Sequence, residues 1–110
     1  MFEKKWNVRI SNHALEVANP KHDVQRIQLE DINEISIETN DSGPIGSDVI
    51  WCVSDGRITI SFPLGATGES DVLTAFQKFD GFDNLGFINA MSSTKNSIFI
   101  LFEKVKAQNG

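Results

Sequence analysis

The spacing of apolar residues changes from the period of strands to that of a helix after residue 62, and that change limits the fold more than any other feature. Up to residue 62, apolar and polar residues alternate in short runs, as in Ile58, Ile60 and Phe62. A period of two is typical of half-buried β-strands. After Ser70 the apolar residues take a helical spacing. The order of these patterns predicts an α+β fold with several short strands first and a helix near the C-terminal end.

The alternating runs predict an antiparallel sheet of six to seven short strands, because most connections between them are too short for crossovers. Their expected positions are residues 6–10, 15–17, 24–29, 35–38, 49–53, 58–62 and 98–102. Asp55 and Gly56, between two apolar runs, are a strong hairpin signal, whereas residues 40–47 form the most loop-like stretch. Such a twisted sheet can curl into a partly closed barrel resembling pleckstrin-homology-like folds. Those folds usually end in a helix, whereas this chain ends in a strand.

One amphipathic helix is expected before the last strand. Ser70 can cap its start, and Gly81 suits the left-handed position after its end. Its apolar face would consist of Val72, Leu73, Phe76 and Phe79. A second short helical stretch is expected from Asp83 onward, with three side chains directed inward: Leu85, Ile88 and Met91. The last strand is apolar without alternation, which predicts that both of its faces are covered.

Length and composition predict a single domain over residues 1–110. The chain has 110 residues, of which 40% are apolar, and this is enough for one core but not for two. Its one cysteine, Cys52, excludes an intrachain disulfide. The N-terminus has no signal-like apolar segment, and no apolar run approaches the ~20 residues of a membrane helix. We therefore expect a cytoplasmic protein without a membrane span.

Acidic residues are concentrated in the middle of the chain. The net charge is −5, and residues 30–83 hold eleven acids against two bases, whereas the two ends hold eight bases against four acids. Nucleic-acid binding needs basic residues that displace counterions from phosphates, so this balance argues against a nucleic-acid partner. An acidic surface attracts a basic protein partner. The simpler interpretation is a solvated surface that keeps the protein in solution.

No motif in the sequence assembles a catalytic or metal site. His13 and His22 fall in predicted turns, and no pair of His, Cys or acidic residues has the close spacing of a zinc site. Cys52 lies within an apolar run and is interpreted as a small core residue. Asp80 and Asp83 fit turn and capping roles better than a calcium loop. The sequence thus predicts no cofactor and no metal, and it favours a non-enzymatic protein.

The candidate binding residues are Trp51, Asp48, Pro44, Asp83 and Asn84. A tryptophan on a half-exposed strand is a common binding anchor, and filling of the core is the alternative role for Trp51. Pro44 would fix a sharp entry into the strand of Trp51. Asp83 and Asn84 would close one helix and open the next stretch. The sequence leaves both the binding role and the structural role of these residues open.

Four segments of the chain carry a resemblance to a known family. They have the patterns GPxxxDVxW from Gly43 to Trp51, GAxG from Gly65 to Gly68, GFDN from Gly81 to Asn84, and AMxSTxN from Ala90 to Asn96, followed by Phe99. Over about residues 6–102, the chain resembles a family of small bacterial proteins that carry a domain of unknown function. The family often has a proline and a tryptophan at two positions where this chain departs from it: Asp80 and a site near Phe102. The resemblance implies a bacterial, cytoplasmic, single-domain protein and transfers no functional residue.

These observations favour a non-enzymatic module that binds a basic protein partner, of an immunity-like or regulatory kind. The alternative is a domain that binds a small molecule or a lipid headgroup, or a minor enzyme, with a pocket near Trp51. A third hypothesis is a structural piece of a homo-oligomer. The three differ in what they require: a salt-sensitive partner, a cavity beside Trp51, or self-association.

Overall fold

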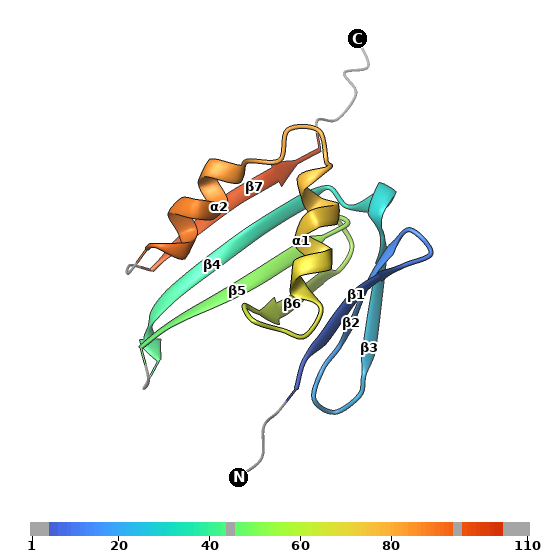
Figure 1. The fold of residues 1–110 in the computed structure, drawn as a ribbon, viewed down its shortest axis with the longest axis horizontal. Helices are drawn as coiled ribbons and strands as arrows, with labels where there is room; N and C mark the ends of the chain where they lie inside the picture. Colours follow the sequence, from blue (N-terminus) through green and yellow to red (C-terminus); the bar gives the residue numbers. More distant parts are fainter. Residues whose placement is uncertain (1–4, 44–45, 94–95, 105–110) are drawn as a thin grey trace.

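The structure, a computed structural model, describes residues 5–43, 46–93 and 96–104, without the side chains of residues 41–48. The described elements follow in this order: β1 (Asn7–Ser11), β2 (Ala14–Ala18), β3 (Val24–Gln28), a 3₁₀ turn η1 (Leu29–Asp31), β4 (Glu34–Gly43), β5 (Gly46–Ser54), β6 (Thr59–Pro63), α1 (Glu69–Gln77), α2 (Asn84–Met91) and β7 (Ser97–Glu103). The α+β class is confirmed, with the helices just before the last strand (Figure 1). Within the described ranges, no helix is long and apolar enough to cross a bilayer.

The strands form two antiparallel sheets, not the single sheet predicted from the sequence. β1, β2 and β3 make one sheet, and the second has the order β6-β5-β4-β7, with no closed barrel in the described part of the chain. The chain changes sheets at η1, where the N–H of Leu29 donates to the carbonyl of His13 at 2.8 Å. α1 packs against β1 and also reaches Trp51 of β5 through Phe76. The two sheets therefore share one core, and a helix contributes to it.

α1 begins two residues earlier than predicted. Its N-cap is Gly68, in the left-handed conformation, and not Ser70. Gly68 follows a loop that binds the backbone of β1, since the N–H of Val8 donates to the carbonyl of Thr67 at 2.8 Å. The predicted apolar face of the helix is confirmed, with two side chains buried and two half-buried: Val72, Phe76, Leu73 and Phe79. Gly81 adopts the left-handed conformation expected of it.

α2 begins where it was predicted but turns a different face to the core. Asp83 caps it by accepting the N–H of Gly86 at 2.8 Å. Gly86 lies close against β7, because a residue without a side chain lets the helix approach the strand. Leu85 and Ile88, predicted to point inward, are 73% and 59% exposed. Of the three residues expected to point inward, Met91 packs partly against the core.

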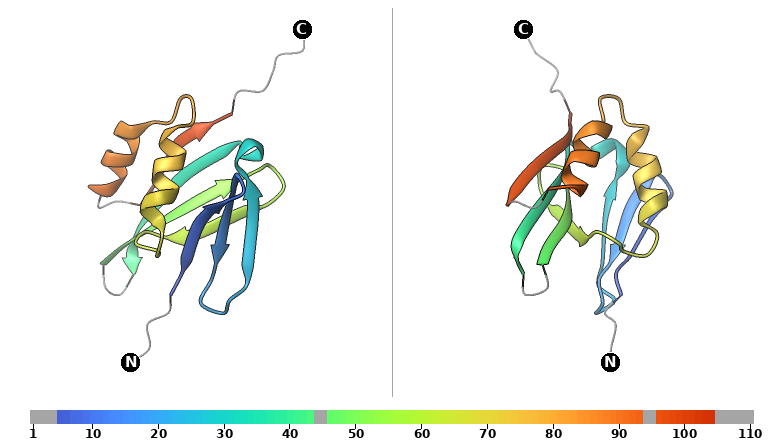
Figure 2. Two further views of the ribbon diagram at one scale, coloured as in Figure 1. Left: turned by 45° about the vertical axis from the view of Figure 1, so that its right-hand side comes forward. Right: turned by 60° about the vertical axis from the view of Figure 1, so that its left-hand side comes forward.

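β7 is an edge strand, not a strand covered on both faces. It pairs with β4 alone. Leu101 is buried and Phe99 is half-buried against the core, but Ile98 and Ile100 are 64% and 48% exposed. α2 covers one face of the sheet here, and no described element covers the opposite face (Figure 2).

The β4–β5 hairpin is longer than the sequence predicted. The two strands continue to Gly43 and Gly46, so most of residues 40–47 belong to strands, with a shift of register near the tip. The turn predicted at Asp55 and Gly56 is confirmed, and it joins β5 to β6. Asp-Gly identifies a tight turn directly, whereas Gly, Pro and Asn residues predict a break without giving its length.

Candidate functional site

Trp51 lies in the core. Its side chain is 1% exposed and stacks with Phe62 and Phe87 at centroid distances of 6.0 and 5.5 Å, while Phe76 tilts against it at 5.6 Å. The indole N–H donates to the carboxylate of Glu69 at 2.7 Å, which satisfies the one polar group of this side chain. Trp51 therefore fills the core. The three rings occupy the space beside the indole, where the ligand of a Trp51 pocket would have to bind.

Of the other predicted binding residues, the structure describes the side chains of two, and both lie at helix ends. Pro44 lies outside the described residues, and the side chain of Asp48, on β5, does so too. Asp83 is the cap of α2, and Asn84 accepts a hydrogen bond at 3.1 Å from the amide of Gln77, at the end of α1. The roles of Asp83 and Asn84 are those that the structural interpretation expected.

Titratable side chains do not form a metal-binding cluster among the residues that the structure describes. No group of three or more His, Cys, Asp or Glu there could hold a metal ion. His13 and His22 lie in turns, as predicted, and both have a positive φ. Cys52 is half-buried and accepts a bond at 3.6 Å from the hydroxyl of Ser61, so it is not the core residue expected from the sequence. Its position on β5 points it away from the buried face that carries Trp51.

A groove of about 500 Å³ lies where η1, the chain after α1 and the end of β7 meet. Its floor is apolar and consists of Leu29, Ile32, Phe79 and Phe102. The rings of Phe79 and Phe102 meet edge to face, with centroids 4.9 Å apart and planes at 88°. Both rings are half-buried, so part of each remains accessible from the groove. The floor thus offers aromatic surface to a bound group.

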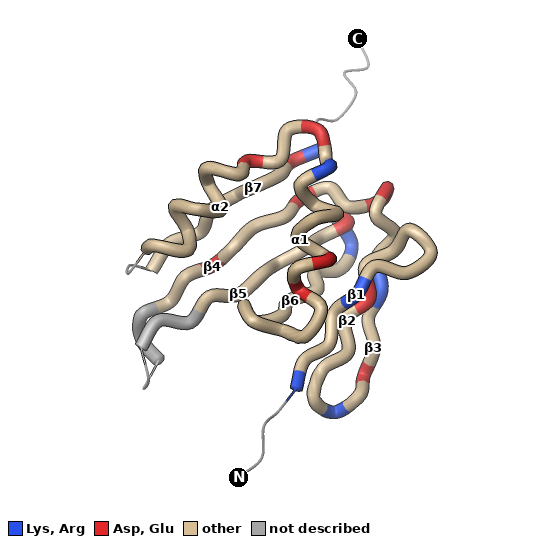
Figure 3. The backbone as a smooth tube through the Cα atoms, in the orientation of Figure 1, with Lys and Arg blue, Asp and Glu red and all other residues tan. Residues whose placement is uncertain are grey.

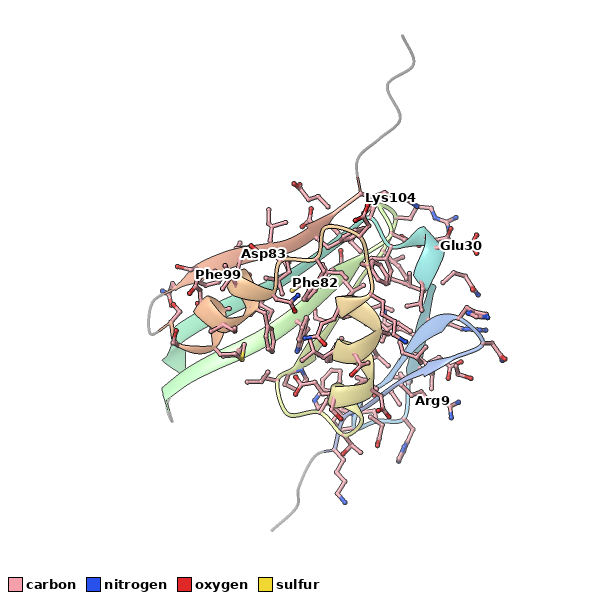
Figure 4. All side chains as sticks on the ribbon, turned by 45° about the horizontal axis from the view of Figure 1, so that its top comes forward. Arg9, Glu30, Phe82, Asp83, Phe99 and Lys104 are labelled. Carbon is pink, nitrogen blue, oxygen red and sulfur yellow. The ribbon has the colours of Figure 1, made fainter. Side chains whose placement is uncertain are left out.

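Carboxylates dominate the rim of this groove. Glu30, Asp80 and Glu103 are exposed along it, together with one base, Lys104. The ammonium of Lys104 donates to the backbone carbonyl of Glu30 at 2.6 Å, and Figure 4 shows the two side by side. None of these three carboxylates forms an ion pair with another described residue. We call the groove and its rim the acidic groove; its three acids against one base leave it negative at neutral pH.

The acidic groove is not predicted by the sequence, because its lining comes from segments far apart in the chain: residues 29–32, 79–80 and 102–104. Two signals for it were present. The acidic excess of the middle of the chain includes Glu30 and Asp80, and Phe79 stands at the end of the predicted apolar helix face. Only the fold brings these features together; near the end of β7, Figure 3 shows acidic and basic segments of the chain close to one another.

Comparison of the chain with family models, with curated proteins and with solved structures finds no match. The resemblance based on sequence motifs therefore stays a prediction. Function has to be inferred from the geometry of the chain itself.

Proposed function

We propose that this chain is a non-enzymatic protein-binding module, and that the acidic groove takes a basic segment of its partner. The observation that carries the proposal is the combination of an aromatic floor with three exposed carboxylates on the rim. An arginine or lysine side chain matches both parts. Its apolar stem can lie on the rings of Phe79 and Phe102, and its charged end can reach a ring face or a carboxylate.

The charge distribution supports the same partner. Acids outnumber bases across residues 30–83 by eleven to two, and such an excess attracts basic partners from a distance. Binding to exposed carboxylates is weakened by salt, because counterions screen exposed charges. A regulatory or immunity-like protein of a bacterial cytoplasm would have these properties, and the single cysteine is compatible with a reducing compartment.

The proposal is tested with a defined probe. The isotope-labelled chain is titrated with a short peptide of alternating leucine and arginine, and the backbone amide signals are followed by NMR at low and high salt. We expect shifts concentrated in residues 29–32, 79–80 and 102–104, with weaker binding at high salt. The same peptide with glutamate in place of arginine should leave these signals in place. Shifts confined to other regions, or equal binding of both peptides, would contradict the proposal.

A pair of charge-reversal variants separates the groove from the overall charge. Asp80→Lys alters the rim, whereas Glu38→Lys makes the same change in net charge outside the groove, on β4 opposite Ile98 near the start of β7. Asp80→Lys should weaken binding of the arginine peptide about tenfold or more, since an attractive contact becomes a repulsive one. Glu38→Lys should have a much smaller effect. Equal losses in the two variants would mean that only net charge matters.

A further inference from the structure

We propose that two copies of this chain associate by antiparallel pairing of their β7 strands. β7 is the last strand of the second sheet, and its far edge meets no other strand of the described chain (Figure 1). A free edge carries backbone donors and acceptors that another strand can bind. The pairing segment runs from Ser97 to Ile100, whereas the acidic groove involves the other end of the strand.

The hydrogen-bond pattern shows which backbone groups of β7 are free. The N–H of Leu64 donates to Val49 and that of Asp55 to Ile58, so the odd-numbered residues of β5 bond to β6. Backbone hydrogen bonds alternate in direction along antiparallel strands. The N–H and C=O groups of the even-numbered residues of β5 therefore point to β4, and those of the odd-numbered residues of β4 point to β7. Ile98 and Ile100, which face even residues of β4, therefore direct their N–H and C=O groups away from the sheet.

These two residues are self-complementary across a two-fold axis through Phe99. In that register, Ile98 of one copy faces Ile100 of the other, and their outward backbone groups are in position to exchange hydrogen bonds. The same pairing brings the exposed side chains of both isoleucines together with those of the second copy on one face of the sheet. The two four-stranded sheets would then form one continuous eight-stranded sheet.

The features of the strand favour a second copy as its occupant. Proteins usually protect sheet edges with lysine, proline or cover by another element, and the edge strand β6 of the same sheet ends in Pro63. β7 has no charged residue and no proline from Ser97 to Phe102. α2 is also uncharged throughout, and the carboxylate of Glu38, opposite Ile98, lies on β4 and not on the edge strand itself. A basic partner therefore meets no carboxylate on this part of the edge strand (Figure 3), whereas an identical uncharged strand meets no like charge.

Towards the C-terminal end of β7, the edge is already covered. A bulge at Leu101 turns its carbonyl outward, and the N–H of Asp83 donates to it at 2.8 Å. This contact limits the free edge to residues up to Ile100. A strand that adds to β7 is therefore held to the Ile98–Ile100 segment, which fixes the register of the proposed pair.

The test is sedimentation of the full chain from micromolar to millimolar concentration, with three variants. Ile100→Lys places a charge in the paired face, and Ile98→Pro removes an outward N–H that β4 does not use. Val24→Lys is the matched control, because Val24 is 63% exposed on β3, an edge strand of the other sheet. We expect a concentration-dependent dimer for the natural chain and for Val24→Lys. Both β7 variants should raise the dissociation constant about tenfold or more.

Amide hydrogen exchange gives a second readout that does not depend on a substitution. In the dimer, exchange at Ile98 and Ile100 should slow as concentration rises, while exchange at Phe99, whose N–H bonds to β4, should not change. A monomer at all concentrations would overturn the proposal. So would a dimer that survives in both folded β7 variants, because the copies would then associate through another surface. Loss of the dimer in Val24→Lys as well would equally contradict pairing through β7.

Discussion

Gly68 determines, at the scale of a single residue, how closely the first sheet can approach α1. Its φ is 90°, and a Cβ at this position would overlap the carbonyl oxygen of Val8. Gly65 has nearly the same φ, 89°, but a Cβ there would meet open space. The two glycines therefore separate two effects of a side chain: strain of the left-handed backbone, which both share, and collision with β1, which only Gly68 has.

We expect Gly65→Ala to lower the free energy of unfolding by about 1–2 kcal/mol, the usual cost of a left-handed residue with a Cβ. Gly68→Ala should cost about 1–3 kcal/mol more, because the collision forces the loop away from β1. Urea denaturation of both variants measures the difference. Equal losses of unfolding free energy in the two variants would show that the close contact of Gly68 with Val8 does not affect stability.

At the scale of the element, the β5–β6 turn is held by one carboxylate. Asp55 accepts the backbone N–H groups of Ile58 and Arg57 at 2.9 and 2.8 Å. These two bonds, that from Ile58 first, hold the pKa of Asp55 below its ordinary value of 3.8. A lowered pKa means that the folded state favours the ionised carboxylate. The resulting stability is present above the ordinary pKa and is lost as pH falls through the lowered one.

Asp55→Asn should therefore change how the free energy of unfolding depends on pH in the acid range. Asparagine keeps an oxygen acceptor for the turn but does not titrate in this range. We expect the natural chain to be more stable than the variant near neutral pH, and the gap to narrow as pH falls below about 4. Urea midpoints of both proteins over an acid pH series give the comparison. A constant gap at all pH values would exclude a contribution from ionisation.

The elements also show where sequence reasoning succeeds. Asp55–Gly56 predicted its turn and Asp83 predicted its cap, because both signals depend on a few neighbouring residues. The prediction of the inward face of α2 was wrong, because this helix is apolar on nearly all sides and the periodicity of its residues indicates no unique buried face. In the structure the helix instead buries Ala90, its Gly86 lies between the cap Asp83 and Leu101 of β7, and Leu85 stays exposed.

The candidate site was less predictable than the elements. The acidic groove depends on which segments meet in space, and local patterns do not contain that information. Likewise, the apolar run of β7 predicted cover on both faces, yet the strand became an edge, because strand order in a sheet is a property of the whole fold. The burial of Trp51 belongs to the same class, since alternation places a residue on a face without saying which face is covered.

At the scale of the whole molecule, the two sheets depend on one helix for their shared core. Phe76 of α1 is fully buried and contacts Trp51 of the second sheet, with Phe79 and Phe82 around it at centroid distances of 5.9 and 6.5 Å. The same helix packs against β1 of the first sheet. Removal of this ring therefore affects the contact between sheets and not just one of them.

Phe76→Ala should lower the free energy of unfolding by about 3–5 kcal/mol, as expected when a buried aromatic ring leaves a cavity. Thr74→Ala, at an exposed position of the same helix, should stay within about 0.5 kcal/mol. Thermal and urea unfolding of both variants measure the losses. A cost below about 1 kcal/mol for Phe76→Ala would mean that another part of the core joins the sheets.

The contact between residue 7 and residue 67, a parallel bridge, also has a consequence during synthesis of the chain. β1, β2 and β3 leave the ribosome before the other described elements and can pair with one another at once, since their strand partners are close in sequence. Their apolar face, with Val8, Leu15, Val17 and Ile27, has no cover until the loop before α1 and the helix itself emerge. At about 5–20 residues per second, that interval lasts on the order of seconds. During that interval, the apolar face of the first sheet is exposed on the nascent chain and accessible to chaperones.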